Sequence, residues 1–160
     1  MSEFTKILKV APLGDGKNWI LLEDFKFYDD KIKGSANDYY WVEVEPRFMT
    51  DFASVPPIFR SLVSNWGKYG NAAVLHDYLY WKQCCTRKEA DNIFKEAMAV
   101  FGVKPLRKWV IYLAVSWFGG FAWNGNTRQR ENGFNRVAIR FPTKASDTPD
   151  DLQTQAPTAN

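Results

Sequence analysis

Two apolar helical stripes in succession, between Ala72 and Phe101, constrain the fold more than any other part of this chain. The first stripe consists of Ala72, Ala73, Leu75, His76, Leu79 and Tyr80, which share one helical face. The second consists of Ala90, Ile93, Phe94, Ala97, Met98 and Phe101. Thr86 and Glu89 form a capping box that marks the start of the second helix. The pattern predicts an antiparallel helix hairpin over about residues 72–101.

The single histidine of the chain, His76, lies in the middle of the first stripe and is followed directly by Asp77. If the helices fold back on each other about the intervening cysteine pair, His76 and Asp91 come within a turn of the same level, since a helix rises about 1.5 Å per residue. A histidine facing a carboxylate on a neighbouring helix can be an oriented general base. A buried histidine satisfied by a structural hydrogen bond is the alternative, and spacing alone leaves both open.

The residues before about position 48 carry β patterning. Residues 19–28 and 39–48 are predicted strands, because apolar and polar side chains alternate along much of each. The expected fold class is α+β, with a small N-terminal antiparallel sheet packed on a helical core in a single domain over residues 1–141. From Pro142 on, small and polar residues dominate, which predicts a disordered tail over residues 142–160.

A third helix is expected over about residues 105–118, ending at Gly119-Gly120, because proline suits a first helical turn. Residues 109–123 carry no charge, but this run is shorter than the roughly 20 residues of a membrane-spanning helix. A central core helix is therefore expected. Its aromatic side chains, with Lys104, Arg107 and Lys108 at one end, would also suit contact with a lipid surface.

Composition limits the classes of partner and compartment. The net charge of +3 is too small to indicate nucleic-acid binding by itself, so a nucleic acid is not an expected partner. The two cysteines, Cys84 and Cys85, are adjacent, and neighbouring cysteines rarely bond to each other, which favours a reducing compartment. The N-terminal residues lack the apolar core of a signal peptide. Nothing in the sequence decides the oligomeric state.

A short polar segment precedes the hairpin. Thr50, Asp51 and Ser54 supply three side-chain oxygens within five residues, and two prolines follow. Such a segment could bind a cation or cap a helix, and a local Asx or Ser/Thr turn is the simpler alternative.

Several linked motifs resemble the domain-of-unknown-function 1353 family over about residues 40–120. They are the segment Thr50-Asp51-Phe52-Ala53-Ser54-Val55-Pro56, the segment Leu75-His76-Asp77-Tyr78-Leu79-Tyr80, and Arg87, Ala90, Asp91 and Phe94. A glycine is more usual in that family at the position of Arg47. The resemblance implies no activity, but it implies a phage or prophage origin. The expected location is then the host bacterial cytoplasm, with packaging in or attachment to the virion as a further expectation.

His-Asp-x-x-Tyr followed by Ala-Asp-x-x-Phe is also similar to the catalytic helix pair of secretory phospholipase A2 enzymes. By this resemblance His76 would be the base that activates water, and Asp77 would be a calcium ligand. Asp91 would orient the histidine, and Tyr80 would hydrogen-bond to Asp91. The glycine-rich calcium loop and supporting disulfides of those enzymes have no recognisable counterpart, so Asp51 is the expected extra metal ligand.

Two functions are expected from these patterns. The first is a calcium-assisted hydrolase of esters or lipids. The alternative is a non-catalytic phage accessory or virion-associated protein that binds a phage or host protein, with the motifs serving the fold. A lipid surface, met through Trp109–Trp123, is a further expected partner.

Overall fold

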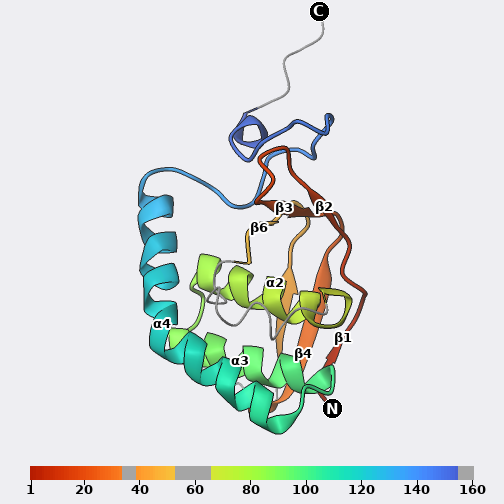
Figure 1. Cartoon of the computed structure of the whole chain (residues 1–160), viewed down its shortest axis with the longest axis vertical. Coiled ribbons are helices and arrows are strands. Elements are labelled where there is room, and N and C mark those ends of the chain that lie inside the picture. The colour runs from red at the N-terminus through yellow and green to blue at the C-terminus, as the bar shows by residue number, and fades with distance from the viewer. Residues whose placement is uncertain (34–38, 53–65, 155–160) are drawn as a thin grey trace, which may run out of the picture.

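In the computed structural model, which describes residues 1–33, 39–52 and 66–154, strands occupy the N-terminal part and helices follow (Figure 1). The strands are β1 (Glu3–Phe4), β2 (Val10–Pro12), β3 (Trp19–Leu21), β4 (Phe25–Lys33), β5 (Tyr39–Val44) and β6 (Met49–Thr50). The helices are α2 (Trp66–Lys82), α3 (Arg87–Val100), α4 (Pro105–Glu131) and a 3-10 turn, η2 (Asp151–Gln153). The α+β class expected from the sequence is confirmed.

The described strands form two three-stranded antiparallel sheets where one was expected. One has the order β1-β4-β5 and the other β2-β3-β6. The predicted strand over residues 19–28 is therefore two strands in different sheets. Within the β4–β5 pair the alternation is as expected: Phe27 pairs with Val42 and both are buried, whereas Lys26 and Glu43 form a surface salt bridge of 3.1 Å.

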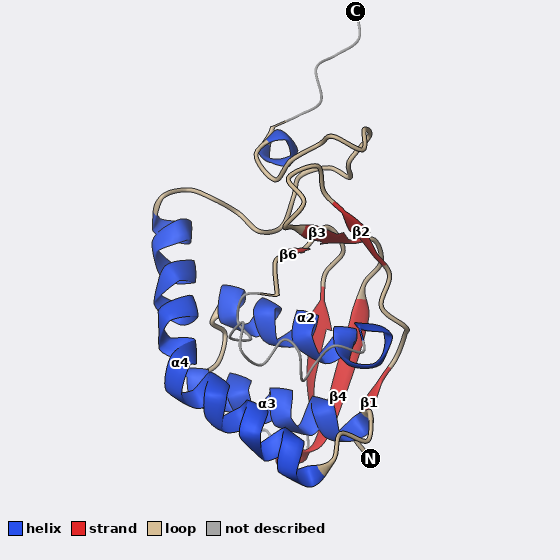
Figure 2. Ribbon diagram, in the orientation of Figure 1, coloured by secondary structure: helices blue, strands red, loops and turns tan. Residues whose placement is uncertain are grey.

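Helix α2 is enclosed by the rest of the fold. Every residue from Tyr69 to Trp81 is buried, and the helix contacts α3, α4, β5 and β6. A helix that is covered on all sides must satisfy its polar side chains internally, and α2 carries His76 and Asp77. Figure 2 shows α2 in the middle of the molecule, with α3 beside it and α4 at the outer edge.

The predicted helix hairpin is confirmed, and α3 begins at its capping box. Thr86 Oγ1 accepts a hydrogen bond from the Glu89 amide at 3.3 Å, and the Thr86 amide donates to Glu89 Oε2 at 2.7 Å. The first helix starts at Trp66, six residues before the predicted start. This extension lies against the N-terminal segment, where a Cβ on Gly70 would come within 2.6 Å of Leu8.

Helix α4 does not end at Gly119-Gly120 as predicted, but continues to Glu131. A Cβ on Gly119 would lie 2.3 Å from the Tyr80 hydroxyl oxygen, so this glycine permits close packing of α4 on α2 and does not terminate the helix. The expected core helix is also buried on one side only, through Ile111, Ala114, Val115, Gly119 and Asn126. None of the described helices combines the length and apolar character needed to cross a membrane.

The chain after Pro142 differs from the tail that was predicted. Residues 142–154 fold back beside β2 and β3 (Figure 1), and Leu152 is completely buried in a small core with Leu13, Ile20, Met49 and Ala138. The Ile139 amide donates to the Leu152 carbonyl at 3.0 Å. Polar contacts add to the burial of Leu152: the Gly14 amide donates to the Asp147 carbonyl at 2.8 Å, and Arg140 pairs with the Asp147 carboxylate at 3.1 Å. Residues 155–160 lie outside the described part of the chain.

Candidate active site

A histidine–aspartate pair bridges the two helices of the hairpin. His76 Nε2 on α2 lies 3.0 Å from Asp91 Oδ1 on α3, and neither side chain has more than 2% of its surface exposed. Because a carboxylate oxygen can only accept, Nε2 is the nitrogen that carries the proton, and the lone pair is left on Nδ1. The pair therefore holds the imidazole in one tautomer.

The carboxylate of Asp91 is held from several sides. Tyr80 donates to Oδ1 at 2.6 Å, and Ser116 of α4 donates to Oδ2 at 3.5 Å. The guanidinium of Arg87 lies 3.8 Å from Oδ2 and also donates to the Ser116 carbonyl at 2.8 Å. Burial, and then the hydrogen bond to Asp91, raise the pKa of Tyr80 above its ordinary value, so its hydroxyl remains a donor.

Aromatic rings fix the plane of the imidazole. Phe94 stacks on His76 with ring centroids 4.5 Å apart at 22°, and Tyr80 lies against it at 4.2 Å. Trp123 of α4 meets the Tyr80 ring edge-on at 5.2 Å. Packing of this kind leaves the imidazole one orientation, which is a requirement for a positioned base.

Asp77, the neighbour of His76, opens onto a small polar pocket. Its Oδ2 accepts a hydrogen bond from the Thr50 hydroxyl at the end of β6. The pocket has a volume of about 190 Å³ and is lined by Asp51, Asp77, Ala122, Gly125, Asn126, Gln129 and Arg136. The structure thus brings together Asp77 and Asp51, the two residues expected as metal ligands. Asp51 is ion-paired with Arg136 at 3.2 Å.

The oxygen atoms that line this pocket could bind a hard cation, but only with low affinity. Asn126 is buried, at 6% exposure, and its side chain lines the pocket. Its amide oxygen and the two carboxylates are ligands that calcium accepts, with water completing the shell. Within residues 1–33, 39–52 and 66–154 there is no cluster of three or more acidic, histidine or cysteine side chains that could hold a metal. Arg136 also neutralises part of the negative charge of Asp51, with which it is ion-paired.

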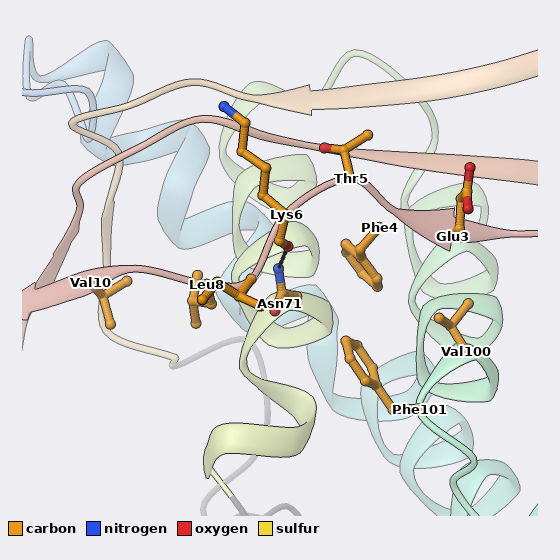
Figure 3. Close-up of a pocket in the computed structure, with 10 residues that line it drawn as sticks. Glu3, Phe4, Thr5, Lys6, Leu8, Val10, Asn71, Val100 and Phe101 are labelled. Carbon is orange, nitrogen blue, oxygen red and sulfur yellow. Dashed lines mark hydrogen bonds between the residues drawn. The ribbon is translucent and has the colours of Figure 1, made fainter.

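A larger pocket, of about 720 Å³, lies elsewhere, between the N-terminal segment and the ends of α2 and α3. Figure 3 shows Phe4 and Phe101 facing each other there, with centroids 5.2 Å apart, and Asn71 donating to the Lys6 carbonyl. Most side chains that line it are apolar. It holds none of the residues that carry the His76 chemistry.

The site also contains residues that the sequence did not indicate. Ser116, Asn126 and Arg136 reach it from α4 and from the chain that follows, 25 to 45 positions beyond Asp91. Nothing in local spacing marks them, although the continuation of α4 past Gly119 places Asn126. Ser54, one of the expected oxygen donors, lies outside the described residues, as does the rest of the motif after Phe52.

The chain belongs to the family described as "Protein of unknown function (DUF1353)", whose model matches residues 19–115. It is 31% identical over 108 residues to a protein of Sinorhizobium fredii (strain NBRC 101917 / NGR234) named "Uncharacterized protein y4iH". That match covers 66% of this chain and 42% of the relative, so the chain spans less than half the length of the relative. No solved structure matches the chain. The family match includes His76, Asp77, Tyr80 and Asp91.

Proposed function

We propose that the protein is a hydrolase of carboxylic esters, with lipid esters as its substrate class. The observation that carries the proposal is the 3.0 Å contact of His76 Nε2 with Asp91 Oδ1, the same oxygen to which Tyr80 donates. A base oriented by a fixed carboxylate is one of the parts that water-mediated ester hydrolysis uses. The similarity of the motif to the phospholipase A2 helix pair supports lipid esters within this class.

In the proposed reaction His76 Nδ1 takes a proton from water as the water oxygen attacks the ester carbonyl carbon. The carboxylate of Asp91 stabilises the imidazolium that forms. The tetrahedral intermediate then breaks its bond to the alkoxide, which receives the proton from Nδ1. The products are a carboxylic acid and an alcohol, and His76 returns to its starting form.

Calcium is part of the proposal at the neighbouring pocket. Asp77 and Asp51 would be its carboxylate ligands, with the amide oxygen of Asn126 beside them. Calcium bound there would supply Lewis acidity to the ester carbonyl. Because Arg136 already pairs with Asp51, we expect weak affinity, on the order of millimolar.

The test is fatty-acid release from phosphatidylglycerol and phosphatidylcholine vesicles, with and without millimolar calcium. His76→Gln retains an amide donor that can reach Asp91, and we expect it to lose about 10²- to 10⁴-fold in rate, the usual contribution of a general base. Tyr78→Phe is the matched control, because Tyr78 lies on the same helix but donates to Glu45 at 3.1 Å, away from the dyad.

Calorimetric titration examines the metal separately. Saturable calcium binding to the wild type that is lost in a folded Asp77→Asn variant supports the metal site. Wild-type protein that releases no fatty acid from either vesicle, with or without calcium, overturns the hydrolase proposal. Equal rates for the wild type and His76→Gln overturn the role given to His76.

A second candidate function is favoured by burial. His76 is completely buried and Asp91 is 1% exposed, as expected of a polar pair that serves the fold. In this case the protein is a phage accessory or virion-associated protein that binds a phage or host protein. His76→Ala and Asp91→Ala would then each destabilise the fold by about 1–3 kcal/mol, with no turnover in the wild type.

A further inference from the structure

One side of α4 exposes an apolar face that no described segment covers. We call it the outer α4 face, and it consists of Leu106, Trp109, Val110, Leu113, Trp117, Phe118 and Phe121. Trp117 is 73% exposed and Phe121 is 82% exposed. Most of these residues recur three or four positions apart, so they share one side of the helix, opposite the side that packs on α2 and α3.

The face is long and continuous. From Leu106 to Phe121 it extends about 22 Å, at about 1.5 Å per residue. Figure 2 shows α4 along the outer edge of the helical layer. Scattered exposed apolar residues are normal, but a contiguous row of seven large side chains marks an interaction surface.

Basic residues lie at both ends of this face. Lys104 and Arg107 are exposed at its N-terminal end, and Arg128 is exposed beyond its C-terminal end. Helix α4 contains no acidic residue before Glu131. Lys95 of α3 adds a further positive charge, with its ammonium 4.9 Å from the centre of the Trp109 ring. The surroundings therefore complement a negatively charged partner.

We propose that the outer α4 face binds the surface of an anionic lipid bilayer, with the helix lying parallel to the membrane plane. Tryptophan and phenylalanine favour the boundary between headgroups and acyl chains, and basic residues at both ends would meet the anionic headgroups. A second copy of the chain fits this face less well. Both ends of α4 are basic, so two such faces would bring like charges together in either orientation.

The membrane proposal rests on the exposed side chains of α4 and does not depend on the hydrolase proposal. The tryptophans within residues 109–123 do not all belong to this face. Trp117 faces outward, whereas Trp123 is turned toward Tyr80 and belongs to the site.

The experiment is vesicle flotation of the full chain. The probes are vesicles of equal parts phosphatidylglycerol and phosphatidylcholine, and vesicles of phosphatidylcholine alone. We expect the wild type to float with the anionic vesicles, and the double variant Trp117→Ser/Phe121→Ser to bind at least about tenfold more weakly. Trp41→Ser is the matched control, because Trp41 is a half-exposed tryptophan on β5, in the sheet rather than on α4. It should float as the wild type does.

Charge is tested by Lys104→Glu/Arg107→Glu. Acidic residues at a helix N-terminus favour the helix, so a loss of binding would not come from unfolding. We expect about tenfold weaker binding to anionic vesicles. His76→Gln should float like the wild type, which keeps this test separate from the hydrolase proposal.

Two outcomes would overturn the proposal. One is a wild-type protein that stays with the soluble fraction in the presence of anionic vesicles. The other is a wild-type dimer, measured by light scattering, that dissociates in Trp117→Ser/Phe121→Ser, which would assign the face to a second copy of the chain.

Discussion

Asp91 Oδ1 receives hydrogen bonds from two side chains of α2. The Tyr80 hydroxyl makes the shorter bond, at 2.6 Å, and His76 Nε2 the longer one, at 3.0 Å. A hydrogen bond to a buried carboxylate contributes more to stability than one between neutral groups, about 1.5–3 kcal/mol. Tyr80 thus links the orientation of the proposed base to the stability of the core.

Tyr80→Phe should lower the free energy of unfolding by about 1.5–3 kcal/mol at pH 8. Burial and the hydrogen bond to Asp91 raise the pKa of Tyr80 above its ordinary value of about 10, so above pH 10 the unfolded chain loses this proton before the folded one does. Wild-type stability should therefore fall as pH rises above 10, by up to about 1.4 kcal/mol per pH unit from this group. Denaturant unfolding between pH 8 and 11 would measure it. The decline should be shallower in Tyr80→Phe, and equal slopes would contradict this account.

At the scale of elements, the packing of α4 on α2 depends on the close approach of Gly119 to Tyr80. Two glycines in succession normally predict the end of a helix, but Gly119 and Gly120 both lie inside α4. The two positions have different surroundings. Gly119 faces the Tyr80 hydroxyl, whereas a Cβ on Gly120 would meet nothing within 4 Å.

This difference supplies a matched pair of substitutions. Gly120→Ala should stabilise the protein by about 0.5–1 kcal/mol, because alanine favours the helix and the site has room. Gly119→Ala should destabilise it by about 1–3 kcal/mol, since the new methyl group displaces Tyr80 from Asp91. Chemical denaturation of the two variants compares them directly. Stabilisation by Gly119→Ala would show that α4 does not pack on Tyr80 as described.

At the scale of the whole molecule, the last described residues pack against the part of the fold that contains the β2-β3-β6 sheet. The Phe48–Val137 bridge and the Gly14 amide, which donates to the Asp147 carbonyl at 2.8 Å, join segments more than 80 positions apart. The small core around Leu152 rests on these contacts.

Leu152→Ala should lower the free energy of unfolding by about 2–5 kcal/mol, the usual cost of emptying a fully buried leucine site. Leu106→Ala is the control, because Leu106 is 79% exposed and the same truncation there should change stability by no more than about 0.5 kcal/mol. Thermal or urea unfolding would measure both. Identical midpoints for the two variants would contradict the docking of residues 142–154.

Much of the hairpin could be read from the sequence because its determinants are local. The capping box at Thr86, the apolar stripes and the level of His76 relative to Asp91 follow from helix geometry alone. One position departs from this local agreement. The backbone at Arg47 is left-handed, with φ of 68°, a conformation that glycine adopts readily and that a side chain disfavours.

The sequence by itself determined the α+β class, the hairpin and the facing of His76 and Asp91, because periodicity and capping act over a few residues. Only the tertiary structure decided that α4 runs past Gly119, that Leu152 docks the end of the chain, and that Asn126 and Arg136 join Asp51 and Asp77 in one pocket. These features depend on contacts between residues far apart along the chain, for which one sequence carries no local signal.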